Sequence, residues 1–449
     1  MNSINNSYIE RPRYLCSLGG ALSTLEALPE TIPVMHCASG CAGSIAWAQN
    51  GGSALQVGGH CGGLTVPSSN VGERDVVFGG TDRLTEQLKN TLEIMEGRLY
   101  VIITGCVTEI IGDDIRAVAA EFESGDYAIV AANTGGFKGN SYLGYDIVLT
   151  SIVNQYVKKA ASKKKKSVNI LGIVPYMDVF WRGNLKGVRR LLEKLGLEVN
   201  TFFTDEDSLD GLKNSSEAEL NIVLSDVYGH ETAKAYEETH GVPYITATLP
   251  IGPTASAELL NAVCGALCLE ADVDAIVGAE NKRYYRCLEL LSDTYNDIDL
   301  QKFAVIIGDV NYAVAVTRFL LDDFGWIPVL TQFTDVLDGE RQEHIAGKLK
   351  APAPLNGPKV VFDTNASEVV RYINELYPKR ESDKYAETIA PAFVIGSSLD
   401  RAAALKIGAP HLSVSFPVSN RAVLSRGYTG FDGGLTLIED LLSAAVAMR

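Results

Sequence analysis

Two thiols and an imidazole occur within six residues of this chain, in the sequence HCASGC from His36 to Cys41. Such a group could bind a metal, form a redox pair, or simply pack in a tight turn. Zinc ribbons and ferredoxins typically carry C-x₂-C pairs, and the spacing of Cys37 and Cys41 differs from that pattern. The local sequence leaves the three alternatives open, so the positions of the other cysteines must decide between them.

Five of the eight cysteines fall within the first 106 residues, and Cys16, Cys41 and Cys106 among them lie in segments with nearby glycines. Cys16 precedes a predicted Gly-Gly turn, Cys41 follows Gly40 in a glycine-rich turn, and Cys106 follows Gly105 at the end of a predicted strand. Buried free cysteine is common, so any one of these thiols alone is most simply a packing residue. Three thiols beside glycines favour ligands that converge from distant segments, because glycine lets backbone approach an inorganic cluster. Three thiolates would leave a large cluster under-coordinated, so a second chain would have to complete the site.

The elements that would position these thiols follow a regular order. Apolar runs that end in Gly, Asp or Asn alternate with amphipathic segments along the chain, as in LYVIITGCV (99–107), ELNIVLSD (219–226) and FAVIIGD (303–309). Such alternation is typical of β-α-β units with parallel sheets, whose functional loops follow the carboxyl ends of strands. We predict an α/β fold of three doubly wound, Rossmann-like domains at 1–165, 166–255 and 256–449. The third opens with a long helical connection.

Composition limits the class of protein. The 449 residues carry a net charge of −16, which argues against a nucleic-acid or anionic-membrane partner. The basic run SKKKKS (162–167) is interpreted as a solvated linker. No segment has the pattern of a signal peptide or a membrane span, which predicts a cytoplasmic protein with reduced cysteines.

Other possible sites are weaker. The chain lacks a P-loop, a G-x-G-x-x-G fingerprint after a strand, and a G-x-S-x-G elbow. We interpret Asp113 and Asp114 as carboxylates that open a helix, where they complement its positive end. The remaining cysteines, Cys264, Cys268 and Cys287, lie in the helical connection and are predicted to be core residues.

Ordered motifs along the whole chain resemble component 1 of nitrogenase, and its β-type subunit in particular. They are CSLGGALSTLEALPETIPVMHCASGC (16–41), VVFGG (76–80), TGCVTEIIGDD (104–114), NTGGFKGNSYLGYD (133–146), LPIGPTASAELL (249–260) and SFPVSNRAVLSRGYTGFDGG (415–434). The resemblance implies that Cys16, Cys41 and Cys106 bind a P-type iron–sulfur cluster, [8Fe-7S] or a related [4Fe-4S], shared with an α-like subunit. No catalytic residue is expected here, because the substrate-cluster ligands of the family belong to the α subunit.

This chain also departs from the family pattern. Gly136 occupies the position of a serine that can act as an extra, redox-dependent cluster ligand in the conventional β subunit. Cys37 stands where the family turn usually has glycine, and Cys61 lies in the unusual VGGHCGGL. Both thiols are interpreted as neighbours of the cluster in preference to ligands, although a fourth thiolate from Cys37 remains open. His36 is expected to hydrogen-bond backbone or a cluster sulfide.

The implied function is electron relay in an α2β2 reductase, from an ATP-dependent iron protein to a metallocluster in the α-like subunit. Only fifteen residues precede Cys16. This short arm, Gly136 and the cysteine substitutions argue against a standard molybdenum nitrogenase. We therefore favour a nitrogenase-like enzyme, with methylthio-alkane reductase ahead of an alternative nitrogenase. A cofactor-assembly scaffold and a metal-free binding protein are the alternatives from other classes.

Overall fold

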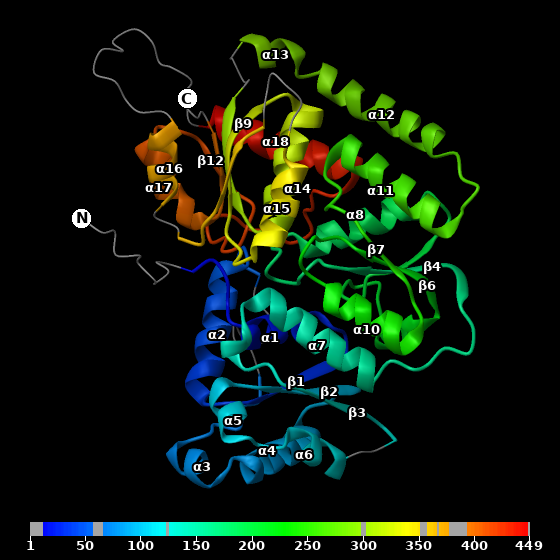
Figure 1. Cartoon of the computed structure of the whole chain (residues 1–449), viewed down its shortest axis with the longest axis vertical. Helices are drawn as coiled ribbons and strands as arrows, with labels where there is room; N and C mark the ends of the chain where they lie inside the picture. Colours follow the sequence, from blue (N-terminus) through cyan, green and yellow to red (C-terminus); the bar gives the residue numbers. More distant parts are fainter. Residues whose placement is uncertain are drawn as a thin grey trace.

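The computed structural model describes residues 12–56, 66–122, 125–297, 302–350, 357–365, 368–376 and 393–447. Within these residues the chain forms three sheets, in which every strand pairing is parallel, and helices flank the sheets (Figure 1). The predicted α/β class with Rossmann-like, doubly wound parallel sheets is therefore confirmed. The sheets span residues 31–132, 164–246 and 303–413. We retain the predicted domain limits near residues 165 and 255 as a proposal.

The first sheet has the strand order β1-β2-β3. Its central strand β2 is buried at every position, as expected for a parallel strand covered on both faces. Val101 and Ile103 face a cluster that includes residues of α1 and α7, whereas Tyr100 and Ile102 pack with residues of α4 and α6. The elements are α1 (Ser17–Ala27), β1 (Thr31–His36), α2 (Ser39–Gly52), α3 (Glu73–Phe78), α4 (Thr81–Ile94), β2 (Leu99–Thr104), α5 (Cys106–Ile111), α6 (Ile115–Glu121), β3 (Ala128–Ala132), η1 (Gly136–Lys138) and α7 (Ser141–Gln155).

The second sheet has the order β5-β4-β6-β7, and β4 corrects one prediction. The lysine run was expected to be a linker, but Lys164 begins β4, and only the first three residues of that strand are exposed. Lys164 pairs with Glu198 on the neighbouring strand β5. The elements are β4 (Lys164–Leu171), α8 (Trp181–Glu193), β5 (Glu198–Asn200), α9 (Leu209–Lys213), η2 (Ser215–Glu217), β6 (Ala218–Val223), α10 (His230–His240) and β7 (Tyr244–Thr246).

The third sheet has the order β10-β9-β8-β11-β12 and follows the predicted helical connection, which forms α11, α12 and α13. The elements are α11 (Gly252–Leu267), α12 (Val273–Glu289), α13 (Ser292–Asp297), β8 (Phe303–Gly308), α14 (Val310–Phe319), the π-helical turn η3 (Leu320–Phe324), β9 (Ile327–Phe333), α15 (Gly339–Lys348), β10 (Lys359–Phe362), α16 (Val369–Leu376), β11 (Phe393–Gly396), η4 (Ser398–Asp400), α17 (Arg401–Lys406), β12 (His411–Ser413) and α18 (Gly430–Val446).

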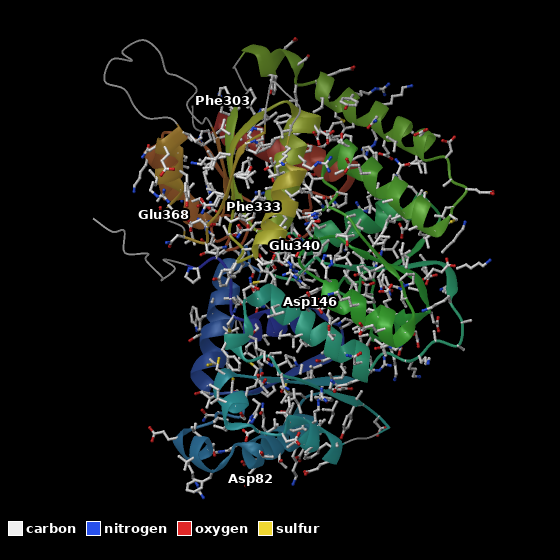
Figure 2. The ribbon with its side chains drawn as sticks, viewed as in Figure 1. Asp82, Asp146, Phe303, Phe333, Glu340 and Glu368 are labelled. Carbon is white, nitrogen blue, oxygen red and sulfur yellow. The ribbon has the colours of Figure 1, made fainter. Side chains whose placement is uncertain are left out.

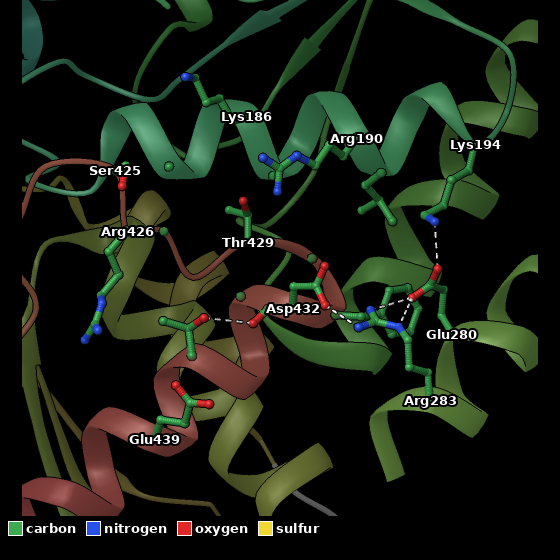
Figure 3. Close-up of a pocket in the computed structure, with 18 residues that line it drawn as sticks. Lys186, Arg190, Lys194, Glu280, Arg283, Ser425, Arg426, Thr429, Asp432 and Glu439 are labelled. Atoms are coloured by element: carbon green, nitrogen blue, oxygen red, sulfur yellow. Dashed lines mark hydrogen bonds and ion pairs between the residues drawn. The ribbon is translucent and has the colours of Figure 1, made fainter. Parts of the chain in front are cut away.

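The last helix, α18, packs against α8, α11 and α12, so the end of the chain returns to the middle of the molecule. A chain of ion pairs reinforces this contact (Figure 3). Lys194 on α8 pairs with Glu280 on α12 at 2.6 Å, and Arg283 pairs with both Glu280 and Asp432, the latter at 2.5 Å. Because these groups are partly exposed, each ion pair adds little to the stability of the fold.

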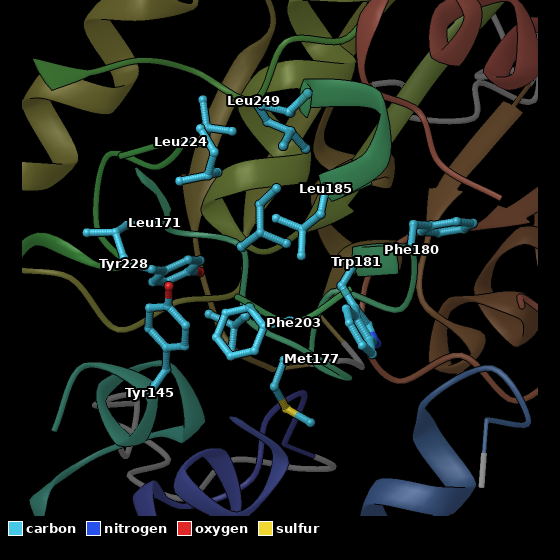
Figure 4. Packing of buried hydrophobic residues seen from close by; sticks show 14 of the residues in the cluster. Tyr145, Leu171, Met177, Phe180, Trp181, Leu185, Phe203, Leu224, Tyr228 and Leu249 are labelled. Atoms are coloured by element: carbon cyan, nitrogen blue, oxygen red, sulfur yellow. The ribbon is translucent and has the colours of Figure 1, made fainter. Parts of the chain in front are cut away.

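Large buried side chains fill the junction between the first two sheets and the C-terminal segment (Figure 4). Trp181 and Phe180 lie at the start of α8, and Phe180 packs against Tyr428 with ring centroids 4.3 Å apart. The hydroxyl of Tyr145 on α7 accepts a hydrogen bond from the backbone N–H of Gly172. One continuous apolar core therefore joins segments from all three sheets. Over the described part of the chain, no helix has both the length and the apolar character needed to cross a bilayer.

Candidate metal-cluster site

Each of the three predicted ligands lies at the amino end of a helix. Cys16 is the residue before α1, Cys41 lies in the first turn of α2, and Cys106 begins α5 directly after β2. The residue before each of these helices makes no side-chain capping hydrogen bond. Exposed amides and the positive helix end favour thiolates and bridging sulfides. The predicted glycine-rich turns at Cys16 and Cys41 are wrong, because both segments are helical.

Two of the three thiols, those of Cys16 and Cys106, lie beside Gly136. A Cβ atom built on Gly136 would lie 3.1 Å from Sγ of Cys106 and 3.2 Å from Sγ of Cys16. Partial burial raises the pKa of the Cys41 thiol, and Cys41 lies near enough to Cys106 and Cys16 that their charges raise it further. The structure therefore brings together all three predicted ligands and the glycine that replaces the family serine.

This group of thiols opens to solvent, and the elements around it carry exposed apolar side chains. Cys41 is exposed, and Cys16 and Cys106 are half-buried. Between 60% and 82% of the surface is exposed for Trp47 on α2, Ile110 on α5, Phe137 in η1, and Phe78 on α3, which contacts α5. Apolar groups so exposed mark a surface that another chain covers. An open, half-complete thiolate site with an apolar rim fits a cluster shared between two subunits.

A site for a single metal ion is the simpler alternative for these thiols. Within the ranges that the structure describes, no three His, Cys, Asp or Glu side chains are close enough to hold a single metal ion. The three cysteines are therefore spread too widely for a mononuclear site. Thiolates are the ligands that iron–sulfur clusters require, and a cluster is large enough to bridge such a spread. The residues present fit an iron–sulfur cluster.

Only some of the neighbouring glycines have the predicted role of making room for a cluster. A Cβ atom on Gly20 would lie 1.8 Å from the carbonyl oxygen of Ser141, so this glycine permits the close crossing of α1 and α7. A Cβ atom on Gly105 would lie 2.6 Å from Cβ of Cys37. Gly40, by contrast, has no atom within 4 Å of the position of its missing Cβ. Gly40 and Gly136 remain as the glycines that leave space beside the thiols.

Cys37 is a buried neighbour of these thiols, near enough to Cys41 and Cys16 that their charges contribute to the raised pKa of its thiol. Its side chain is 1% exposed, and its sulfur is 3.8 Å from the hydroxyl of Ser68. Burial raises the pKa of the Cys37 thiol to about 11, which disfavours the thiolate that a ligand would need. The other unusual thiol, Cys61, lies outside the described residues together with His60.

His36 forms a different set of contacts from the predicted one. Its Nδ1 lies 2.9 Å from Oγ of Ser69, and its Nε2 lies 2.9 Å from Oδ2 of Asp113. Both ring nitrogens are therefore occupied by side chains, and neither is left for backbone or a cluster sulfide. Burial lowers the pKa of His36 despite the nearby carboxylate. Asp114 accepts hydrogen bonds at the start of α6 as predicted, whereas Asp113 binds His36 and the N–H of Gly80.

Sequence reasoning missed Glu109, which ties the site together. One of its oxygens accepts 2.5 Å hydrogen bonds from the hydroxyl of Thr104 and the N–H of Gly135, and the other pairs with Lys138 at 2.8 Å. Glu109 thereby links the helix of Cys106 to the turn that contains Gly136. Its position three residues after Cys106, on the same short helix, was the available signal.

The thiols of the helical connection are not a buried set. Cys264 and Cys287 are half-buried, and Cys268 is exposed at the C-terminal end of α11. The prediction that all three are core residues is therefore wrong. They also lie apart from the thiols of the N-terminal site.

Fold and site together define a three-domain α/β protein with an open thiolate site at one face of its first domain. The chain belongs to the nitrogenase component 1 type oxidoreductase family, whose model matches residues 16–445. A nitrogenase molybdenum-iron protein beta chain from Frankia alni is 26% identical over 412 residues, which cover 84% of this chain and 72% of the relative. One subunit of a light-independent protochlorophyllide reductase from a Picosynechococcus species is 23% identical, covering 82% of this chain and 72% of the relative.

A further relative supports the same family, and a solved structure supports the fold. A nitrogenase iron-molybdenum cofactor biosynthesis protein, NifE, from Methanococcus maripaludis is 22% identical over 93% of this chain and 80% of the relative. A solved structure titled "Nitrogenase Cp1 at pH 6.5" superposes with a TM-score of 0.81 at 19% identity, covering 100% of this chain and 95% of that one. The predicted resemblance to component 1 of nitrogenase and its β-type subunits is confirmed.

Proposed function

We propose that this chain is the β-like, electron-relaying subunit of a nitrogenase-like two-component reductase. Cys16, Cys41 and Cys106 would hold one half of a P-type iron–sulfur cluster, [8Fe-7S] or a related [4Fe-4S]. The observation that carries the proposal is that Cys16 and Cys106 lie together beside Gly136, with Cys41 nearby, at an open face with exposed apolar side chains. Membership of an oxidoreductase family supports the reaction class.

The residues of this chain have distinct tasks in the proposal. The three thiolates bind iron, and the amino ends of α1, α2 and α5 stabilise the negative charge that collects there. The cluster, when bound, supplies one-electron transfer. Glu109 fixes the turn of Gly136 against Cys106, so the spacing of the thiolates is held before a cluster binds. Because Gly136 has no side chain, this subunit offers the cluster thiolates alone.

The proposed partners follow from the incomplete site. An α-like subunit would cover the apolar rim, supply the remaining thiolates and hold the substrate-reducing metallocluster, in an α2β2 complex. An ATP-dependent iron protein would deliver electrons, in the cytoplasm. Two of the relatives are named as a beta chain and as one subunit of a reductase, which supports a chain that works beside a second type of subunit.

Among substrates, we favour the methylthio-alkanes, with an alternative nitrogenase as the next choice. The departures at Cys37 and Gly136 support a divergent enzyme over a standard molybdenum nitrogenase. The purified complex would be given its iron protein, ATP and reductant, and offered ethylene-releasing thioethers, dinitrogen and a tetrapyrrole in parallel. Ethylene release supports the favoured substrate, and ammonia formation supports the alternative.

An assembly scaffold is the second candidate, because NifE aligns with 93% of this chain. A scaffold would hold and transfer a cluster without reducing an external substrate. Absence of iron-protein-dependent turnover in the assay above, together with transfer of iron and sulfide to an acceptor protein, would favour this role.

Cys106→Ala tests the cluster site itself. Anaerobically purified complex should contain iron and sulfide, and the substitution should abolish the cluster signal in electron paramagnetic resonance. Cys268→Ala is the matched control, since that thiol is exposed and far along the chain. A colourless, iron-free wild-type complex, or an unchanged signal in the Cys106 variant, would contradict the proposal.

A further inference from the structure

A cavity of about 570 Å³ lies where the three sheets meet, separate from the open face of the thiols. Three of the segments that line it follow the carboxyl ends of strands, one strand in each sheet. Residues 136–146 follow β3, residues 227–231 follow β6, and residues 335–341 follow β9 (Figure 1). Doubly wound sheets bind their ligands beyond the carboxyl ends of strands, and ligand pockets favour domain junctions. Three such edges therefore face one candidate ligand pocket.

The cavity and the cluster site share a wall. Gly136, which contacts Cys16 and Cys106, also lines the cavity, and the N–H of Ser17 donates to the carbonyl of Gly139 in the same wall. Asp146 on α7 lies in this region, beneath Glu340 at the start of α15 (Figure 2). A ligand in the cavity would lie next to the proposed cluster.

Asp335 is the distinctive group in the cavity. Its side chain lines the cavity although the residue is only 4% exposed. One oxygen accepts a hydrogen bond from the hydroxyl of Tyr228 at 2.7 Å, and the other accepts from the N–H of Val310 at 2.8 Å. No Lys, Arg or His of the described residues forms an ion pair with it. Burial, and then the nearby carboxylate of Asp309, raise the pKa of Asp335 to about 7. A buried carboxylate of this kind lacks the counter-ion that such groups normally have.

The other side chains of the cavity are compatible with a positive ligand. Tyr14 and Tyr142 contribute phenol rings, and Tyr142 stacks on Tyr228 at 3.9 Å. Tyrosine rings attract cations through their faces. The cationic side chains at the rim are already paired, Lys138 with Glu109 at 2.8 Å and Arg341 with Asp338 at 3.6 Å. Their charge is therefore partly compensated, whereas that of Asp335 is not.

We propose that this cavity binds a small organic cation, a protonated amine with an apolar body, with Asp335 as its counter-ion. The ammonium group would donate to the free lone pairs of the carboxylate in a charge-assisted hydrogen bond. The apolar body would pack against Leu143 and Val227, which line the same cavity. This binding is independent of the thiols, so it can be tested whether or not a cluster is present.

The test uses the full-length chain, purified with the subunit that accompanies it, in isothermal titration calorimetry at pH 8. The probes are phenylethylammonium, uncharged phenylethanol and anionic phenylacetate, which share one apolar body. We expect the ammonium compound to bind at least tenfold more tightly than either analogue. Equal binding of phenylethanol, tighter binding of phenylacetate, or no binding of the ammonium compound would overturn the proposal.

Variants locate the site. Asp335→Asn keeps the shape of the side chain and should weaken the binding of phenylethylammonium at least tenfold. Glu343→Gln, at an exposed carboxylate of α15 that does not line the cavity, should change this affinity less than twofold. If the Asp335 variant does not fold, Tyr14→Ala, at a partly exposed position of the same wall, should weaken the ammonium compound severalfold. Unchanged affinity in the folded Asp335 variant, or in the Tyr14 variant, would refute the assignment.

Discussion

A buried ion pair anchors the segment that leads to Cys16, and it provides the sharpest test of the structure. Both terminal nitrogens of Arg13 donate to Asp400 on η4, each at 2.6 Å, and one also donates to the hydroxyl of Ser397 at 2.7 Å. The two side chains are 1% and 0% exposed. The pair joins the N-terminal segment to the third sheet and lies three residues before the first proposed ligand.

The expected loss of stability depends on whether a substitution leaves an unpaired charge in the core. Arg13→Ala removes the only cation that Asp400 pairs with in the described chain, so a buried carboxylate loses its compensation, and such losses cost about 3–5 kcal/mol. For a cooperative unit of 150–250 residues this lowers Tm by roughly 6–20 °C. Replacing both partners with apolar residues of similar volume, Arg13→Met with Asp400→Leu, leaves no unpaired charge and should recover most of that loss.

Differential scanning calorimetry of the single and double variants measures this difference, and iron analysis reports whether Cys16 is still held in place. Lys164→Ala is the matched control, because its pair with Glu198 is about half-exposed on both sides and contributes about 0–1 kcal/mol. A loss below about 1 kcal/mol for Arg13→Ala, or a double variant as unstable as the single one, would refute the reasoning on buried charge.

Three further outcomes are expected. Gly20→Val should prevent the α1–α7 crossing and lower the free energy of unfolding by more than about 3 kcal/mol. Gly43→Ala, on an open helix face, should be neutral or stabilise the cluster-free chain by up to about 1 kcal/mol. Denaturant unfolding of the two variants measures the difference. Gly136→Ser places an oxygen beside two thiolates and should alter the spectrum of the oxidised cluster without loss of iron, and Gly136→Ala should not. Burial raises the pKa of Glu26 to about 7, so the folded chain binds this proton more tightly than the unfolded chain. Stability should therefore fall by up to about 3 kcal/mol as pH rises from about 4.5 to 7, and Glu26→Gln should remove this dependence, as unfolding at pH 5 and pH 8 would show.

The predicted strands include β2 and β8, whereas β1 was not predicted. Strands such as β2 and β8 are apolar runs because parallel strands are covered on both faces. β1 carries Pro33 within TIPVMH, a residue that argues against a central strand. The sheet order places β1 at an edge, where proline is tolerated, but only the pairing of distant segments shows which strand is at the edge.

The prediction of a Gly-Gly turn beside Cys16 was wrong for a related reason. Gly19 and Gly20 are poor helix formers, so SLGGAL favours a turn when only local propensity is considered. In the structure Gly20 is required by contact with Ser141, which lies 121 residues further along the chain. Tertiary packing therefore overrides propensity here, and the helix that results gives Cys16 its position at a positive helix end.

The different positions of the two thiols in HCASGC follow from the alternation of side chains along β1, once that strand is known. Side chains alternate between the two faces of a strand, so Met35 and Cys37 share one face and Val34 and His36 share the other. Met35 and Cys37 indeed pack in the cluster that includes α1 and α7, whereas Val34 packs in the opposite one. Cys37 is thus directed into the core by the register of β1. Cys41 lies in the first turn of the next helix, α2, outside that register, and there its thiol reaches the open face where Cys16 and Cys106 lie.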